Sequence, residues 1–174
     1  MPNYTTVFGS LKDYEKGRIE IISDKPRNYC FSNIFEVANQ SAPYEKVAVA
    51  KNLENVIEAI RTEGESPWYT NSHDEFALVM DGEVEISFHK AVDDEVVPED
   101  QEGTHSIDGE PKGPKMGRVV LKRGHQAILP KGSVYRFRAD GVGVMMQQTI
   151  LGPLTVQKWA DICRRRRQRR LRNS

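Results

Sequence analysis

Two stretches of the chain, residues 64–82 and 124–135, constrain its fold more than any other part of the sequence. In the first, Asp81-Gly82 separates the apolar-rich runs FALVM and EVEISF. In the second, Pro130-Lys131-Gly132 separates HQAIL from VYRF. Glycine supplies the positive φ of a tight turn and proline presets its own φ, so both patterns are typical of turns between antiparallel strands. The sequence therefore predicts two tight β-hairpins.

The same two stretches resemble the paired sequence motifs of the cupin superfamily. The residues of this chain that match the motifs are Gly64, Glu75, Gly82, Gly124, Pro130 and Gly132. The resemblance implies an all-β fold, a double-stranded β-helix or jelly-roll barrel. Barrels of this superfamily usually hold a metal at the mouth.

The metal ligands of those motifs are missing from this sequence. The two histidine positions of the first motif fall among residues 68–72, which contain no histidine, and His73 lies between the ligand positions in every alignment. In the second motif Tyr135 holds the histidine position and Ala139 the asparagine position. Only Glu75 remains of four usual ligands, whereas a tightly held transition metal needs about three or four converging donors. We therefore expect a barrel that binds no metal.

Four side chains stand where the ligands would be or beside those places: Trp68, Tyr69, Asn71 and Tyr135. One interpretation is that these bulky groups simply fill the barrel once the metal is gone. The other is that, together with Glu75, they form the wall or lid of a pocket, one that another chain can share. The Pro67-Trp68 bend and the enrichment of aromatic residues at interfaces make the second interpretation strongest for Trp68.

Glu75 itself admits three hypotheses. With His73 two residues away, it can seed an unorthodox metal site. With His73 or Tyr135, it can serve as acid or base in metal-independent chemistry. The simplest hypothesis is a buried carboxylate that accepts hydrogen bonds from neighbours such as Tyr69 or Tyr135.

Periodicity and turn residues divide the chain into three parts. An N-terminal arm, residues 1–24, should hold a short helix after Ser10 and a strand at 18–22. The barrel, residues 25–152, should hold strands at 33–38, 46–51, 55–61 and 83–90, with an acidic loop inserted at about 92–117 that is either disordered or covers a partner. Residues 153–174 should form a C-terminal helix with an arginine-rich tail.

Charge and cysteine content narrow the cellular setting. The net charge is zero, but residues 164–174 hold seven arginines and no acid, which leaves 18 basic and 25 acidic side chains elsewhere. Because no nucleic-acid motif accompanies it, we interpret the arginine run at 164–172 as a cationic helix end that docks on an acidic surface.

The sequence also predicts a cytoplasmic location. No long apolar run predicts a membrane span, and the N-terminus lacks a secretory pattern. Cys30 and Cys163 are far apart, which favours free thiols in the cytoplasm over a disulfide.

Longer runs of the chain resemble one family in particular. FGSLKDYEKG, SAPYEKVAVAKNLENVIEA, HDEFALVMDGEVEI, GPKMGRVVLKRGHQAILP and QTILG are similar to the small subunit of two-component hydroquinone 1,2-dioxygenases. The resemblance implies a hetero-oligomer, expected to be a heterotetramer, in which a larger cupin-like subunit binds Fe(II) and hydroquinone. With O2, such enzymes open the ring to 4-hydroxymuconic semialdehyde. The resemblance gives Trp68, and with it Tyr69, the role of a pocket wall or lid facing the substrate.

Two rival functions remain open at this level. One is a stand-alone, metal-free cupin that binds a small ligand as a sensor or storage protein. The other is an epimerase- or isomerase-like enzyme that uses Glu75, His73 or Tyr135 as acid and base, which requires His73 to point into the barrel.

Overall fold

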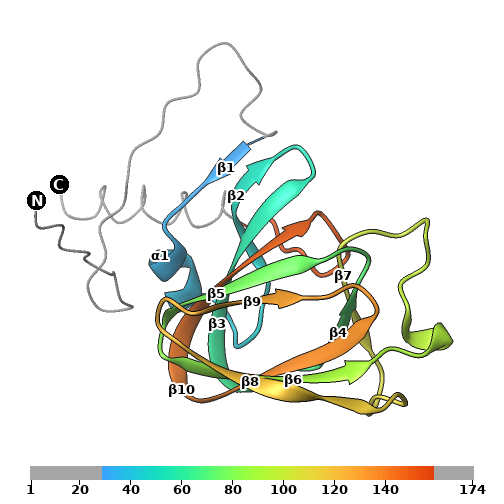
Figure 1. The fold of residues 1–174 in the computed structure, drawn as a ribbon. Helices are drawn as coiled ribbons and strands as arrows, with labels where there is room; N and C mark the ends of the chain where they lie inside the picture. Colours follow the sequence, from blue (N-terminus) through green and yellow to red (C-terminus); the bar gives the residue numbers. More distant parts are fainter. Residues whose placement is uncertain (1–28, 159–174) are drawn as a thin grey trace, which may run out of the picture.

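The computed structural model describes residues 29–158, which form an antiparallel β structure that curls on itself (Figure 1). The elements are β1 Tyr29–Phe31, α1 Ile34–Asn39, β2 Val47–Asn52, β3 Asn55–Glu65, β4 Trp68–Asn71, β5 Glu75–Asp81, β6 Glu83–Lys90, the short 3-10 helix η2 Asp93–Glu95, β7 Thr104–Ile107, β8 Lys115–Lys122, β9 Gln126–Leu129 and β10 Ser133–Ile150. The predicted all-β class is confirmed.

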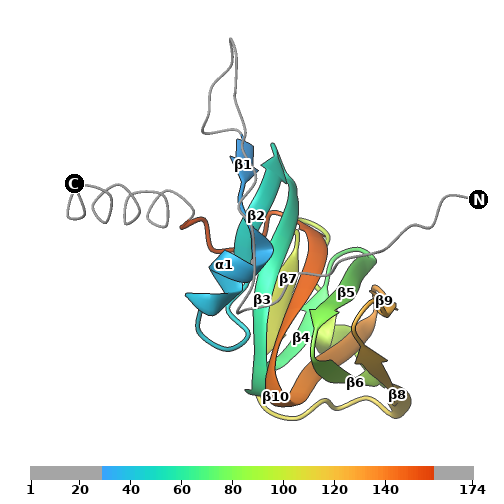
Figure 2. The ribbon, with the colours of Figure 1, turned by 90° about the vertical axis from the view of Figure 1, so that its left-hand side faces the viewer.

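The long strand β10 organises the barrel, because it runs through both of its layers (Figures 1 and 2). Its first half pairs with β6, from Ser133 opposite Lys90 to Arg138 opposite Glu85. After an irregularity between Ala139 and Gly143, its second half pairs with β3 on one side and β5 on the other. β8 then extends the first layer beyond β6, and β9 extends the second beyond β5.

The two glycine turns have the predicted backbone but not the predicted pairing. Gly82 has φ +84° and Gly132 has φ +79°, the left-handed region that favours glycine. However, β5 pairs with β9 and β10, not with β6, so β5 and β6 lie end to end along β10. The prediction of hairpins is wrong: each turn is a corner at which the chain passes from one layer to the other.

The predicted strand at residues 33–38 is also wrong, because this segment is the helix α1. The side chain of Asn33 accepts hydrogen bonds from the backbone N–H groups of Phe35 (2.9 Å) and Glu36 (3.1 Å), which caps the helix. Val37 packs on β2 and β3, whereas Phe35 packs near Val144 of β10. A short apolar run suits a strand or a buried helix equally well, and the cap decides between them here.

The acidic insertion is more ordered than the predicted loop. It contains β7, which pairs with all four residues of β4, from Trp68 opposite Ile107 to Asn71 opposite Thr104. Buried Glu95 accepts hydrogen bonds from the backbone N–H groups of Val92 (3.0 Å) and Lys112 (2.8 Å). These bonds tie both ends of the insertion together, and the prediction of a loop without strands is wrong.

The predicted strands at 46–51, 55–61 and 83–90 correspond to β2, β3 and β6 and are confirmed. Residues 153–158 form a turn and a bridge between Val156 and Val47, so the predicted C-terminal helix does not begin at Pro153. The remainder of that helix, the arginine run, the N-terminal helix and the strand at 18–22 lie outside the described residues. Within residues 29–158, no helix is long and apolar enough to cross a membrane.

An apolar cluster to which both layers contribute fills much of the barrel interior. Its buried members are Tyr44, Ile60, Tyr69, Ala77, Val79, Val84, Ile86, Leu121, Leu129, Tyr135, Phe137, Ala139 and Met145. Because strand side chains alternate, the neighbours of these residues along each strand point away from this cluster. Two of the predicted site residues, Tyr69 and Tyr135, therefore face the interior.

Candidate functional site

Glu75 lies at the centre of a buried hydrogen-bond network inside the barrel. It is the first residue of β5 and is fully buried. One carboxylate oxygen accepts from the hydroxyls of Thr104 (2.7 Å) and Thr149 (2.6 Å). The other accepts from the hydroxyl of Tyr135 (2.8 Å) and the amide of Gln147 (2.5 Å). Four donors occupy both oxygens, so this carboxylate is fully satisfied by the protein itself.

Tyr135 and Glu75, which occupy matched positions of the two sequence motifs, are hydrogen-bonded to each other. The predicted hydrogen bond from Tyr135 is confirmed, whereas Tyr69 contributes its ring, whose centroid is 5.9 Å from that of Tyr135. Burial raises the pKa of Tyr135 well above its ordinary value, and the nearby carboxylate of Glu75 raises it further. Tyr135 thus remains a neutral donor across the physiological pH range.

A buried lysine extends the network towards the other side of the barrel. Nζ of Lys46 donates to Oε1 of Gln147 (2.7 Å) and lies 3.8 Å from a carboxylate oxygen of Glu58. The same ammonium lies over the Tyr69 ring, 4.8 Å from its centroid. Desolvation lowers the pKa of Lys46 and raises that of Glu58, while their attraction opposes both shifts. Lys46 thus connects Glu58 with the Glu75 cluster through Gln147.

The donor set does not fit a metal ion. Among residues 29–158, no three or more His, Cys, Asp or Glu side chains converge on one point. His73 pairs its Nδ1 with the hydroxyl of Ser72 (3.2 Å), and the amide of Asn71 donates to the carbonyl of Leu129 (2.7 Å). Glu75 and Tyr135 are committed to each other. The position of the usual metal is therefore filled by hydrogen-bonded side chains.

Trp68 lies apart from the other four predicted site residues, on the opposite face of β4 from Tyr69. The centre of the Arg136 guanidinium lies 4.5 Å from the indole ring centroid, and the His89 ring meets it edge-on at 5.2 Å. Its Nε1–H donates to a carboxylate oxygen of Glu110 (3.2 Å). The structure thus brings Tyr69, Tyr135 and Glu75 together inside the barrel, with Asn71 close by, and places Trp68 outside.

Comparisons with known proteins place this geometry in a family. No protein-family model and no curated protein matches the chain. Among solved structures, a chain of the hydroquinone 1,2-dioxygenase PnpCD, in complex with Cd2+ and 4-hydroxybenzonitrile, is 55% identical, with a TM-score of 0.79 over 91% of this chain and 96% of that one. A chain of hydroquinone 1,2-dioxygenase from Sphingomonas sp. TTNP3, with 4-hydroxybenzoate bound, is 53% identical over the same shares, with a TM-score of 0.81.

The chain belongs to the small subunits of the hydroquinone 1,2-dioxygenases. PnpCD also contains a second chain, which is much longer than this one. In a structure of PnpCD in complex with Fe3+, the match to this hydroquinone dioxygenase subunit covers only 38% of the other chain, at 10% identity and a TM-score of 0.56. That likeness concerns the fold alone.

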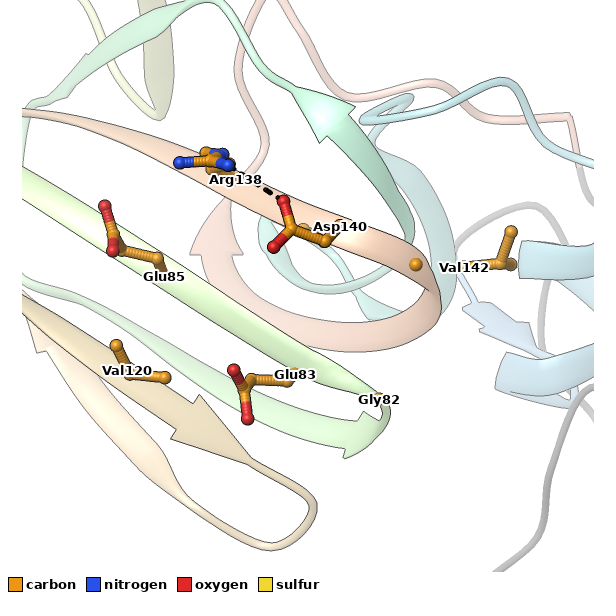
Figure 3. A pocket seen from close by; sticks show the side chains of 9 residues that line it. Gly82, Glu83, Glu85, Val120, Arg138, Asp140 and Val142 are labelled. Carbon is orange, nitrogen blue, oxygen red and sulfur yellow. Dashed lines mark hydrogen bonds and ion pairs between the residues drawn. The ribbon is translucent and has the colours of Figure 1, made fainter.

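The small subunit also has an open cleft on the outer side of the bend in β10 (Figure 3). Its volume is about 260 Å³, and it is lined by Gly82, Glu83, Glu85, Val120, Arg138, Ala139, Asp140, Gly141 and Val142. Each carboxylate in it has a basic partner: Glu83 pairs with Lys122, Glu85 with Arg118 and Asp140 with Arg138. These neutralised pairs leave the cleft without a free charge for a ligand.

The sequence motifs of this dioxygenase subunit did not reveal Lys46, Glu58 or Gln147. Lys46 directly precedes the apolar run VAVA, and Gln147 lies within VMMQQTIL. A polar residue beside or inside an apolar run was the one signal in the sequence that could have marked them as buried. Arg136, His89 and Glu110 around Trp68 were missed as well. Their contact depends on the pairing of β4 with β7 and β10, which local patterns do not specify.

Proposed function

We propose that this chain acts in a hetero-oligomer, such as a heterotetramer, with a larger cupin-like subunit, which binds Fe(II) and hydroquinone. The complex would convert hydroquinone and O2 to 4-hydroxymuconic semialdehyde. This chain would complete the active site, shield it from water and stabilise its partner. The 55% identity to a chain of PnpCD over nearly the whole length is the single observation that carries this proposal.

The barrel interior supports the assignment of the metal to the partner. Non-haem Fe(II) oxygenases commonly use two histidines and one carboxylate. Here the carboxylate of the motif, Glu75, already accepts four hydrogen bonds, and Tyr135 stands in the motif's histidine position. Releasing Glu75 to a metal would leave several buried donors unsatisfied, at a cost of about 1–3 kcal/mol each. The interior is therefore better suited to stability than to iron binding.

Trp68 is the residue through which we expect this chain to meet the substrate cavity, as part of its wall or lid. Its side chain lies on the face of β4 that is turned away from the barrel interior, beneath Arg136 and Glu110 and only 6% exposed. The other four residues, Tyr69, Asn71, Glu75 and Tyr135, are buried on the interior side. Their contribution to the pocket is to hold β4 in place. A wall that excludes water and fixes the ring in position would favour the reaction of bound hydroquinone with oxygen.

The isomerase-like alternative gains no support from the geometry. Its acid would be Tyr135, but that hydroxyl already donates to Glu75 and has a strongly raised pKa. His73 pairs with Ser72 and does not hydrogen-bond to Tyr135. A cytoplasmic location suits the proposal, because Fe(II) and free thiols both persist in a reducing compartment.

Co-expression with the larger subunit tests the proposed function. The small subunit is purified alone and as the co-purified pair, and iron content, O2 consumption with hydroquinone and ring-opened product are measured for each. We expect stoichiometric iron and turnover only in the pair. Tight iron binding and full activity by the isolated small subunit would refute the proposal.

The role of Trp68 needs variants of the same pair. Replacing Trp68→Phe or Trp68→Ala should leave iron content unchanged but alter kcat or KM for hydroquinone. Phe retains most of the ring volume, so it protects the experiment against loss of folding. Wild-type kinetics in both variants would limit Trp68 to packing.

A further inference from the structure

We infer that Arg136 and Glu110 are positioning residues, which set the orientation of the Trp68 indole and thereby the shape of the substrate pocket. This inference rests on the proposed role of Trp68 at that pocket. The two residues come from different parts of the fold, Arg136 from β10 and Glu110 from the acidic insertion. They contact different parts of the same ring, so together they restrict both its tilt and its rotation.

Arg136 controls the face of the ring. The centre of its guanidinium lies 4.5 Å from the indole centroid, within the range of a cation–π contact. Its Nη1 lies 3.4 Å from a carboxylate oxygen of Glu65 and 3.9 Å from one of Glu110. Because its charge is anchored in this way, the guanidinium plane can support the indole at a fixed height above β10.

Glu110 controls the rotation of the ring. A Trp side chain has one hydrogen-bond donor, Nε1–H, and here it donates to a carboxylate oxygen of Glu110 (3.2 Å). A flipped indole would direct its N–H elsewhere and lose this bond. The pairing of Glu110 with Trp68 therefore selects one of the two ring orientations.

The insertion holds Glu110 in place through contacts of its own. Buried Glu95 binds the backbone N–H of Lys112, and Nδ1 of His89 lies 2.9 Å from the carbonyl oxygen of Gly113. The imidazole of His89 also meets the indole edge-on at 5.2 Å. The acidic segment is thus folded back over β4, with its buried anchors a few residues from the carboxylate that the indole uses. Only 6% of Trp68 remains exposed, so a small change in its tilt decides what it presents to a neighbour.

The test uses the complete two-subunit enzyme and measures kcat and KM for hydroquinone. We expect Glu110→Ala and Arg136→Gln each to lower kcat/KM roughly three- to ten-fold, as for the loss of one exposed cation–π contact or charge-assisted hydrogen bond. Glu110→Gln, which keeps an acceptor oxygen, should recover most of the loss. Arg138→Gln is the matched control, because Arg138 is on the same face of β10 but pairs with Asp140.

A double-mutant cycle separates positioning from general damage. In a Trp68→Phe enzyme the indole N–H is absent, so adding Glu110→Ala should have no further effect on kcat/KM. A second measurement does not depend on activity: in the small subunit purified alone with Trp159→Phe, which leaves Trp68 as its single tryptophan, the emission should shift to longer wavelength with Glu110→Ala and not with Arg138→Gln.

The outcomes distinguish the inference from the proposed function. If Trp68→Phe and Trp68→Ala alter turnover while Glu110→Ala and Arg136→Gln do not, the inference is overturned and the role of Trp68 stands. If the loss from Glu110→Ala persists undiminished beside Trp68→Phe, Glu110 does not act through the indole and the inference is likewise overturned. If no Trp68 variant changes the kinetics, both fail.

Discussion

The interior of the barrel and the outer face of β4 are built from the same strands but are stabilised in opposite ways. Inside, Glu75, Tyr135 and Gln147 are buried, and their polar atoms are bonded to each other. Outside, Trp68 is held by Arg136 and Glu110, whose side chains remain 29% and 78% exposed. Interactions of the first kind are costly to break, whereas each contact of the second kind contributes about 1 kcal/mol or less.

This difference shows where the polar groups of the barrel contribute to its stability. In the interior, four hydrogen bonds converge on Glu75, and Lys46 joins this network through Gln147 and approaches Glu58. The outer face of β4 is held by weaker contacts, which can be rearranged at little cost to the fold.

The largest expected effect tests the interior directly. Replacing Glu75→Leu removes the acceptor of four buried donors and should lower the free energy of unfolding by about 4 kcal/mol or more. Urea unfolding of the purified subunit measures it. Glu83→Gln, at an exposed pair with Lys122, should change the same quantity by less than about 0.5 kcal/mol. Equal free energies of unfolding for the two variants would contradict the view that interior polar contacts stabilise the fold more than exposed ones.

Buried Lys46 should show energetic coupling with Glu58. Lys46→Met removes the group that faces the buried carboxyl of Glu58 and should cost about 3 kcal/mol. The double variant Lys46→Met with Glu58→Gln should recover part of that loss, because no unpaired charge remains. Denaturant unfolding of the four members of the cycle gives the coupling energy. Strict additivity would mean that the 3.8 Å approach of Lys46 to Glu58 has no energetic importance.

Alkaline pH should destabilise the fold, because it ionises tyrosines that are buried in the interior. Burial raises the pKa of Tyr44 from 10.0 to about 12, and it also raises those of Tyr69 and Tyr135. A raised pKa means that the folded state holds the proton more tightly, so stability is complete below pH 10 and falls as pH rises towards 12. For Tyr44 alone the loss is roughly 2.5 kcal/mol. Thermal unfolding between pH 9 and pH 12 measures it, and Tyr44→Phe should make the decline less steep.

The smallest expected effect concerns the outer face. Glu110→Ala should change the free energy of unfolding by less than about 0.5 kcal/mol, because the carboxylate is largely solvated. Urea unfolding of the small subunit checks it, beside Glu75→Leu as the contrasting variant. A loss of several kcal/mol would show that the outer cluster supports the fold and would remove the distinction between the two regions.

Local patterns in the sequence were sufficient for some of these features and not for others. Alternation in EVEISF and the glycine at 82 specified a half-buried strand and a positive φ, since both depend on neighbouring residues only. They did not specify that β5 and β6 pair with β10 and not with each other, which is a property of the whole barrel. The spacing of Asn33 and Glu36 was a capping signal for α1 that the apolar run between them obscured.

The candidate site divides in the same way. Motif spacing identified Glu75 and Tyr135 as interior residues, because matching positions in one fold point to the same side of the sheet. It also showed that histidines are missing from the ligand positions of the motifs. It gave no means of placing Lys46, which reaches Gln147 from a point 101 residues earlier in the chain. The sequence identified Trp68 as a candidate but not the face of β4 on which its side chain lies. That face follows from the contact of the indole with Arg136 of β10, which local patterns do not specify.

The path of β10 has a consequence for biosynthesis. It supplies pairing edges to β3, β4, β5 and β6, yet it is the last strand to leave the ribosome among those in residues 29–158. Until it emerges, the earlier strands lack their common neighbour and expose apolar surface to solvent. We therefore expect the nascent polypeptide to depend on chaperones until translation has passed residue 150, and nonsense mutations before that point to yield aggregates.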